Sequence, residues 1–284
     1  MARSSMVLLK TLAMNKRFTI GLSIFMAIML ISIIGPIIYN KDPTAFTGPF
    51  ESPPSSNYPL GTDTYGRDVL AQLLVGTRNS LYVGFITAVI AMGIGSIVGA
   101  LAGVKGGLVD EILMAITNIV LAIPSILLAI LIASYLSVRS FEMVALLLGI
   151  TGWPWYARAI RSQLMSLRER EFVYLSKMAG YGSLELAFKD LLPNIATYVF
   201  MAMILYINGG ILGEAGLSII GVGPTQGVTL GIMLQWAALF ESVRRGLWWW
   251  FIPPGIVIVA ITASLIVVAT AMDEVFNPRL REVG

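Results

Sequence analysis

Long apolar runs separated by short polar segments occupy most of the chain. Each run is long enough to cross the roughly 30 Å hydrocarbon core of a bilayer as a helix. The pattern predicts six spanning helices, at about 18–40, 80–104, 112–138, 143–161, 195–217 and 247–272. Pro124 lies within the third and should kink it, because proline disrupts the hydrogen bonding of a helix interior. The fourth passes Trp153 and Tyr156 before Arg158 and Arg161, the order typical of a helix that leaves a bilayer on its cytoplasmic side.

The first apolar run follows a short basic segment, residues 1–17, so a cleaved signal peptide is an alternative interpretation. The run is too long for a signal peptide and lacks a small-residue cleavage site, and we therefore favour a first spanning helix at 18–40. Residues 41–79 are polar and rich in turn formers. They predict an extended connector, a surface loop at Leu60–Asp68 and an interfacial helix that runs to Arg78.

A polar island with helical periodicity lies between the fourth and fifth spanning helices, at 168–193. Its apolar residues recur every three or four positions, at Phe172, Leu175, Met178 and Ala179 and then at Leu184, Ala187, Phe188 and Leu191. Gly180-Tyr181-Gly182 should bend the chain between two short amphipathic helices. Ser183 is placed to cap the second helix, and Pro193 should end it.

The segment before the last spanning helix, residues 218–246, is uncharged as far as Glu241 but is interrupted by the sequence GVGPTQG. Such a segment cannot be a plain spanning helix, so we expect an external or re-entrant loop packed against the bundle. The last spanning helix then starts at an aromatic belt, Trp248–Trp250. Residues 80–272 would form the helical core of the molecule, and residues 273–284 would form a short tail.

The composition agrees with an integral membrane protein. The 284 residues are 57% hydrophobic and only 12% charged, about half the charged fraction of soluble domains, and the mean hydropathy is +0.82. The chain contains no Cys and no His. It therefore lacks a disulfide framework, thiol chemistry, the commonest general base and the commonest transition-metal ligand.

The distribution of basic residues predicts which side of the membrane each segment faces. With both termini inside, 13 of the 19 basic residues lie in inner segments and 6 in outer ones. Because cytoplasmic loops carry the excess of Lys and Arg, both termini and the polar island at 168–193 should face the cytoplasm. The net charge of +3 reflects this bias and does not indicate nucleic-acid binding.

Candidate residues for chemistry are few. Ionisable residues inside spanning segments mark proton and ion pathways, and here only Glu214, at the end of the fifth segment, approaches that position. A proton-coupled transporter and an intramembrane hydrolase are both disfavoured, so we expect no catalytic residue and no metal site. Pro124, Asn208, Gly209 and Gly210 are candidate pore or hinge residues. For the Asn-Gly-Gly sequence, close helix packing is the alternative interpretation.

The sequence contains no GxxxxGK[ST] phosphate-binding loop. If ATP drives transport, the ATPase must be a separate polypeptide, and this chain itself should bind no cofactor. The polar island is then the natural docking point for that ATPase.

Five motifs occur in the order found in one family of membrane proteins. They are LGTDxxGRD at Leu60–Asp68, a loop at Gly103–Glu111 that leads to Ala122–Ser125, GWxxYARxxR at Gly152–Arg161, a signature at Glu171–Asn194, and Glu214–Gly223. On these residues most of the chain resembles the C-type permease subunits of ATP-binding-cassette importers of the dipeptide, oligopeptide and nickel group. Three departures occur: Tyr174-Leu175-Ser176 replaces the Glu-Ala-Ala core of the signature, Ile219-Ile220 replaces Phe-Leu, and the tail at Ala269–Arg279 matches only loosely.

The resemblance implies an all-α type I importer permease with six spanning helices and cytoplasmic coupling helices, in the cell membrane of a prokaryote. Two different permeases would form one pore, two ATPases that bind ATP and Mg would dock below, and an extracellular or periplasmic binding protein would deliver substrate. The expected ATPase-coupling residues are Glu171, Tyr174, Leu175, Ser176, Met178, Ala179, Gly180, Tyr181, Gly182, Ser183, Leu184, Glu185 and Pro193.

Several alternatives stay open at the level of sequence. Oligopeptides are the default substrate of this group, while oligosaccharides, nickel and glutathione are carried by related permeases. A stand-alone channel or secondary transporter is a further alternative, and it predicts transport by this chain without an ATPase.

Overall fold

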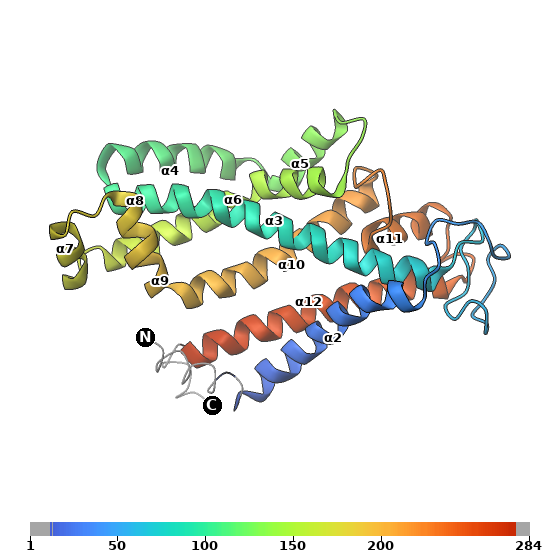
Figure 1. Ribbon diagram of the computed structural model, residues 1–284. Helices are drawn as coiled ribbons and strands as arrows, with labels where there is room; N and C mark the ends of the chain where they lie inside the picture. Colours follow the sequence, from blue (N-terminus) through green and yellow to red (C-terminus); the bar gives the residue numbers. More distant parts are fainter. Residues whose placement is uncertain (1–11, 13, 277–284) are drawn as a thin grey trace.

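The computed structural model describes Leu12 and residues 14–276, and in these residues helices form an elongated bundle without a β-sheet (Figure 1). The longer elements are α2 (Lys16–Ile38), α3 (Val69–Lys105), α4 (Gly107–Ala122), α5 (Ser125–Ser134), α6 (Phe141–Leu167), α10 (Ala196–Ile220), α11 (Leu230–Leu239) and α12 (Trp248–Phe276). A short group between α6 and α10 comprises α7 (Glu171–Met178), α8 (Ser183–Glu185), the π-helical segment η1 (Leu186–Leu191) and α9 (Leu192–Asn194).

Four helices, α2, α3, α10 and α12, are long and apolar enough to cross a membrane. α4 and α5 meet the same criteria together, as one broken span. α6 has 27 residues and reaches about 40 Å, but its second half, which carries Arg158 and Arg161, is less apolar. The predicted count of six is therefore not confirmed. The described residues contain four such helices, or five with the broken pair.

α3 is the central helix of the bundle. It has 37 residues and packs against α2, α4, α6, α10, α11 and α12. Asp68 caps its first turn by accepting hydrogen bonds from the backbone N–H groups of Leu70 and Ala71. The interfacial helix predicted to end at Arg78 and the spanning helix predicted from residue 80 are thus one continuous helix, because no helix-breaking residue separates them.

Glycines let α3 approach its neighbours closely. A Cβ atom added to Gly95 would lie 3.0 Å from the carbonyl oxygen of Trp153, and one added to Gly99 would lie 2.5 Å from that of Ala157. Gly103 faces the next turn of α6 in the same way, with the carbonyl oxygen of Arg161 at 3.0 Å. These glycines recur every four residues, so one face of α3 brings its backbone against α6. Small residues at the interface thus allow the close backbone approach that is typical of helix pairs in membranes.

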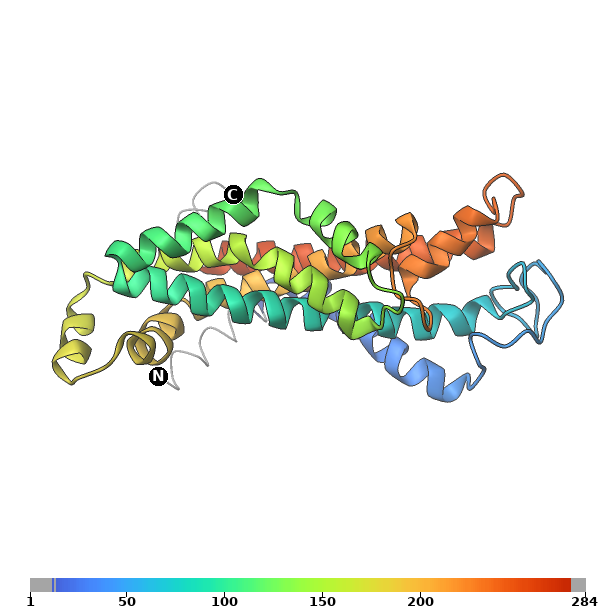
Figure 2. The ribbon, with the colours of Figure 1, turned by 90° about the horizontal axis from the view of Figure 1, so that it is seen from above.

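The third predicted span is broken at Pro124 and not merely kinked. α4 ends at Ala122, Ile123 is extended, and α5 starts at Ser125 with its axis bent by 76°. The reason is local, because proline disfavours helical geometry at the residue before it. α5 and the chain after it then turn toward α6 (Figure 2).

The fifth predicted span is longer and straighter than expected. α10 continues without a break through Asn208-Gly209-Gly210 and ends at Ile220, where Gly221 adopts φ +94. The segment that follows includes α11, an apolar helix of 10 residues whose buried members are Leu230, Gly231, Ile232, Met233 and Ala237. α12 then continues through Pro253 and Pro254. The predicted tail at 273–284 lies outside the described residues from 277 onward.

The start of α2 and the end of α12 lie at the same end of the bundle as α7–α9 (Figure 1). Arg17 on α2 forms an ion pair with Glu274 on α12 at 2.5 Å. The connector between α2 and α3 lies at the opposite end, beside the segment between α11 and α12. This is the relative placement that the charge distribution predicted.

Gly99 provides a test of the contact between α3 and α6. Changing Gly99→Ala should destabilise the fold by about 1–3 kcal/mol, the cost of overpacking a close helix contact. Gly93 on the same helix has open space around its Cβ position, so Gly93→Ala should be neutral or should add up to about 1 kcal/mol of helix stability. Melting temperatures of the two purified variants in one detergent compare them. Equal melting temperatures would contradict the glycine contact.

Candidate functional site

The helix group α7–α9 projects from one end of the bundle (Figures 1 and 2). It connects the end of α6 to the start of α10, so a force on it acts on both long helices. Three of its side chains, Val173, Leu186 and Leu191, are at most 2% exposed and pack in one cluster with Ile160 and Leu164 of α6. The element is therefore anchored to the bundle by its own apolar side chains.

The opposite surface of α7 is apolar but exposed. Leu175 is 67% exposed and Met178 is 85% exposed. Tyr174, the residue before Leu175, is also exposed. The sequence pattern grouped Leu175 and Met178 with Phe172 on one apolar face. In the structure, Val173 is the residue of α7 that reaches the core, and Leu175 and Met178 point away from it. Exposed apolar patches of this kind mark sites of protein interaction.

A tight turn joins α7 to α8. The N–H of Gly180 bonds to the carbonyl of Lys177 at 3.0 Å, and the N–H of Tyr181 bonds to that of Ser176 at 3.2 Å. This is the Schellman arrangement, which requires a left-handed residue at the position of Gly180, and its φ is +87. The predicted cap by Ser183 is wrong. Gly182 occupies the capping position, and no side chain accepts a hydrogen bond there.

The second helix of the element contains a π segment, η1, directly before α9. Pro193 follows within α9 and lacks the N–H that would continue regular α-helical bonding. The helix ends at Asn194, one residue after the predicted stop, and the Asn194 amide donates to the carbonyl of Asp190 at 2.7 Å. Ala187 and Leu191 are buried as members of this helix, whereas Phe188 is largely exposed.

Glu185 and Lys189 form an ion pair of 2.6 Å across one turn of the second helix. Their hydrogen bond lowers the pKa of the Glu185 carboxyl and raises the pKa of Lys189. On α7, the pKa of Tyr174 is raised because its hydroxyl donates to Glu169 at 3.2 Å. The exposed surface of the element therefore combines apolar side chains with paired charges.

A second feature is a cavity of about 360 Å³ beside the middle of α10. Residues of α3, α5, α6 and α10 line it: Thr87, Ser125, Ile126, Leu148, Thr151, Gly152, Leu205, Tyr206, Gly209, Gly210 and Gly213. Its polar groups are neutral hydroxyls, and the Tyr206 hydroxyl donates to the carbonyl of Gly152 at 3.1 Å. Such a surface offers hydrogen bonds to an uncharged polar solute.

The predicted pore or hinge residues differ in their surroundings: some border the cavity, and some pack against other helices. Gly209 has no atom within 4 Å of its Cβ position and borders the cavity. Gly210 borders it too but also packs on α3, with the Cα of Gly84 2.9 Å from its Cβ position. Asn208 is buried, and Pro124 breaks the chain next to Ser125 at the cavity edge. The close-packing interpretation of the Asn-Gly-Gly sequence therefore holds for Gly210, the helix has no break at these residues, and a role of Gly209 in a pore stays a prediction.

At the far end of the bundle, the Leu60–Asp68 motif forms a buried polar anchor and not a simple surface loop. The Asp63 carboxylate accepts hydrogen bonds from the side chain of Arg67 at 2.5 Å and of Gln72 at 2.9 Å. It also accepts the backbone N–H groups of Tyr65 and Arg67. The Trp249 indole of α12 donates to the carbonyl of Thr62 at 3.1 Å. The anchor therefore ties the connector to α3 and α12.

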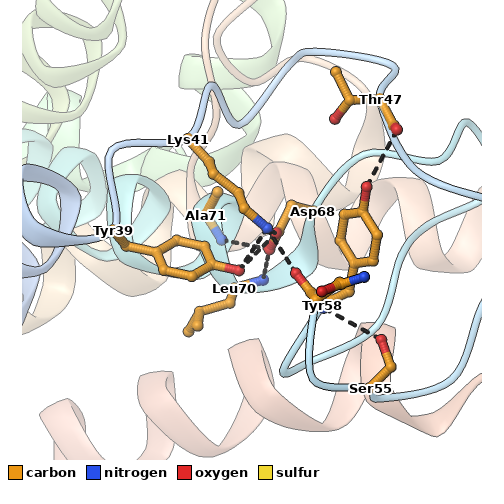
Figure 3. A network of polar contacts seen from close by, with 9 residues as sticks. Tyr39, Lys41, Thr47, Ser55, Tyr58, Asp68, Leu70 and Ala71 are labelled. Atoms are coloured by element: carbon orange, nitrogen blue, oxygen red, sulfur yellow. Dashed lines mark hydrogen bonds and ion pairs between the residues drawn. The ribbon is translucent and has the colours of Figure 1, made fainter.

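Asp68 completes this anchor from the other side (Figure 3). The Tyr39 hydroxyl donates to its carboxylate at 2.7 Å and the Lys41 ammonium at 2.9 Å. Burial and the bond to Asp68 raise the pKa of Tyr39. Desolvation lowers the pKa of Lys41, but the bonds to Asp68 and Tyr39 outweigh it, so that pKa is raised overall. Two aspartates and an arginine within a short Gly-rich stretch were the available sequence signal for this anchor.

Glu214 of α10 is fully buried and holds the external segment against α3 and α10. Its carboxylate accepts hydrogen bonds from the hydroxyls of Ser218 and Thr229 at 2.6 Å, and from Ser80 at 3.3 Å. The hydroxyl of Ser80 also accepts the backbone N–H of Leu230. Glu214 is thus a packing centre for the start of α11. In the described part of the chain, no three His, Cys, Asp or Glu side chains gather to hold a metal ion.

Arg161 and Asp110 connect α6 to the start of α4 near α7–α9. The guanidinium contacts both carboxylate oxygens, with Nη2 at 2.5 Å from Oδ2. Arg158 donates to Asn118 of α4 at 2.7 Å. Both arginines belong to one of the family motifs, and their bidentate and amide contacts position α4 along α6.

Helices long and apolar enough to cross a membrane, together with a projecting helix group whose exposed surface is apolar, indicate a multi-pass membrane protein. Residues 95–282 match the model of the family described as "Binding-protein-dependent transport system inner membrane component". The chain belongs to this family, as a permease of the OppC and DppC type of ATP-binding-cassette transporter.

Several characterised relatives are similar over most of the chain. The oligopeptide transport system permease protein OppC of Bacillus subtilis is 36% identical over 74% of this chain and 68% of its own length. The dipeptide transport system permease protein DppC of Haemophilus influenzae is 36% identical over 80% of this chain and 79% of its own. DppC of Bacillus subtilis is 30% identical over 96% and 85%.

Asp63 provides a test of the external anchor. Changing Asp63→Asn should cost about 3–5 kcal/mol, because it leaves the buried Arg67 guanidinium without its counter-charge. Thermal unfolding followed by tryptophan fluorescence measures the loss, and Trp249 reports on the anchor directly. Asp42 is exposed and bonds only within its own turn, so Asp42→Asn should stay within about 0.5 kcal/mol. Comparable losses in both variants would contradict the anchor.

Proposed function

We propose that this chain forms half of the translocation pore of an ATP-binding-cassette importer for peptides. The substrate class follows from the names of its relatives, which are oligopeptide and dipeptide permease proteins. Oligosaccharide, nickel and glutathione, the alternatives raised by the family resemblance, have no support among these relatives. The cavity beside α10 has no charged side chain in its lining, so it accommodates the uncharged hydrogen-bonding groups of a peptide backbone, but it does not itself select the substrate class.

The observation that carries the proposal is the helix group α7–α9. One of its faces is buried against α6 and α3, while the other exposes Leu175 and Met178 at the end of the bundle. An element anchored in this way transmits force from a soluble partner to the membrane helices. The partner would be a pair of ATP-binding subunits, which would supply the ATP and Mg sites, while this chain would contribute no catalytic residue.

The contact with the ATPase would involve the exposed residues of α7, the turn and the start of α8. The left-handed turn at Gly180 fixes the angle between α7 and α8. The predicted coupling set runs from Glu171 to Glu185 and includes Pro193, which supports the second helix from its far end. ATP-driven closure of the ATPases would move this set as one body, and rocking of α6 and α10 would then alternate access to the cavity.

The cavity beside Gly209 is open on one side of the chain. We infer that a second, homologous permease closes it and that the pore lies between the two chains. An extracellular or periplasmic binding protein would meet the opposite end of the molecule, where the connector and the segment before α12 lie side by side (Figure 1).

The orientation we propose places both termini and α7–α9 in the cytoplasm of a prokaryotic cell, with six crossings. In this assignment α6 is the least apolar of the six crossings. In its second half, Tyr156, Ala157, Ile160 and Leu164 are buried, and Arg161 pairs with Asp110 of α4. The ion pair between Arg17 and Glu274 supports a common side for the two ends of the described chain.

Leu175 tests the docking surface. Changing Leu175→Asp should weaken the binding of the ATPase subunits by about 2 kcal/mol or more, the effect typical of a central interface residue. Copurification with the ATPase subunits and substrate uptake into vesicles measure the effect.

Leu239 offers a matched control, since it is also 67% exposed but lies on α11 at the other end of the molecule. Leu239→Asp should leave ATPase binding unchanged. The coupling assignment fails if the two variants behave alike. Uptake that continues when ATP is withdrawn would instead favour a stand-alone channel or secondary transporter.

Gly209 tests the pore surface. Changing Gly209→Phe should fill the cavity and reduce uptake to background, while ATPase copurification stays normal. Gly216 on the same helix also has open space at its Cβ position but does not line the cavity, so Gly216→Phe serves as the control. Normal uptake by the Gly209 variant would exclude this cavity from the pathway.

A further inference from the structure

A long apolar groove lies on the outer side of the bundle, where α2 crosses α3 and α10. Its upper part, a cavity of about 420 Å³, is lined by Phe25, Met29 and Ile33 of α2, by Tyr82 and Phe85 of α3 and by Ile207 of α10. A second cavity of about 230 Å³ continues it and shares Phe25 and Ile207 with the first. The groove is therefore elongated and follows α2.

One cation borders this groove. Arg78 of α3 lines its upper cavity and is exposed. The other basic residues of the same end have partners: Lys41 pairs with Asp68, Arg67 with Asp63, Arg244 with Glu241, Arg245 with Glu51, and Arg139 binds backbone carbonyls. Within the described part of the chain, Arg78 makes no hydrogen bond, ion pair or ring contact.

The neighbours of Arg78 place it at the outer boundary of the membrane-spanning region. Asn79 donates to the carbonyl of Val228, in the external segment before α11, at 2.7 Å. One turn further along α3, Tyr82 donates to Glu142 in the first turn of α6 at 3.3 Å. The groove thus has a cation at its polar end and apolar side chains along the rest of its length.

We propose that this groove binds an anionic glycerophospholipid, with the phosphate at Arg78 and one acyl chain along α2. A guanidinium matches the bidentate geometry of a phosphate, and the long side chain of an arginine on a bilayer helix extends toward the headgroup region. The aromatic side chains of the groove provide apolar contact for an acyl chain, and tyrosine is enriched at the membrane–water interface. The proposal requires only that α2 and α3 lie in a bilayer, so it does not depend on the transported substrate.

A lipid at this position would fill the space between α2 and α10, since the groove separates these helices along α2. α2 packs mainly on α12 and α3. The bound lipid would then act as a packing element that attaches the first helix to the moving core.

The experiment is a native mass-spectrometry titration of the delipidated full-length chain. Phosphatidylglycerol and phosphatidylcholine with identical acyl chains are compared, and we expect at least one tightly bound phosphatidylglycerol. Changing Arg78→Gln should weaken its binding about tenfold, to the level of phosphatidylcholine. Arg78→Lys should have an intermediate effect, because it keeps the charge without the bidentate geometry.

Two further variants separate the contribution of the lipid headgroup from that of the acyl chain. Met29→Trp should fill the groove and weaken phosphatidylglycerol binding while Arg78 is intact. Arg244, exposed and paired with Glu241 at the same end, provides the control, and Arg244→Gln should bind like the unchanged chain. Melting temperatures verify that each variant is folded.

Three results would overturn the proposal. The first is unchanged binding in both Arg78 variants, and the second is competition by inorganic phosphate at the concentrations used for the lipid. The third concerns the assembled importer. The chain has no Cys, so Ile33→Cys introduces a single thiol, and its crosslinking to the second permease without bound phosphatidylglycerol would show that a protein covers the groove.

Discussion

The backbone of α3 touches α6 without an intervening side chain at Gly95, Gly99 and Gly103, and this contact positions the remaining helices. Lipid tails are as apolar as the side chains of a spanning helix, so burial of apolar surface contributes little to helix association in a bilayer. Close backbone contact replaces it. α3 can therefore serve as the common surface on which α6, α10 and α2 pack.

Polar contacts at the two ends of the bundle then fix the rotation and height of the helices, which glycine packing alone does not determine. At the end that carries the connector, Asp63 and Asp68 hold the connector on the start of α3, and Glu214 holds the start of α11. At the end that carries α7–α9, Arg161 and Asp110 bring α4 to α6. Hydrogen bonds of this kind are directional, so they fix the rotation and height of each helix more sharply than apolar packing alone.

Much of the helical part of the fold follows from sequence pattern, and its failures have local physical reasons. Apolar runs predicted α2, α10 and α12, because a spanning helix must be apolar along its length. The break at Pro124 was underestimated, since the sequence does not reveal whether neighbouring helices support a kinked helix or a sharp bend. The continuity of α3 past Arg78 was missed because the amphipathic run before Arg78 was predicted as a separate interfacial helix, although no helix-breaking residue separates it from the spanning run.

The candidate site was predictable in position but not in orientation. The periodicity at 168–193 located the helix pair, yet it assigned Leu175 and Met178 to the same face as a core residue. Periodicity reports that a face is apolar, not which molecule covers it. The external anchor was interpreted as a loop, because the burial of Asp63 and Arg67 depends on Trp236 and Trp249 from distant segments.

The length of α3 has a mechanical consequence. Its 37 residues correspond to a stiff rod of about 55 Å, capped at its first turn by Asp68 and packed near its other end beside α8 and η1. A tilt of about 5° about the capped end displaces the other end of a helix of this length by about 5 Å. A slight adjustment at Asp68 would thus become a displacement of helical-turn size beside α8 and η1, with no flexible joint between them.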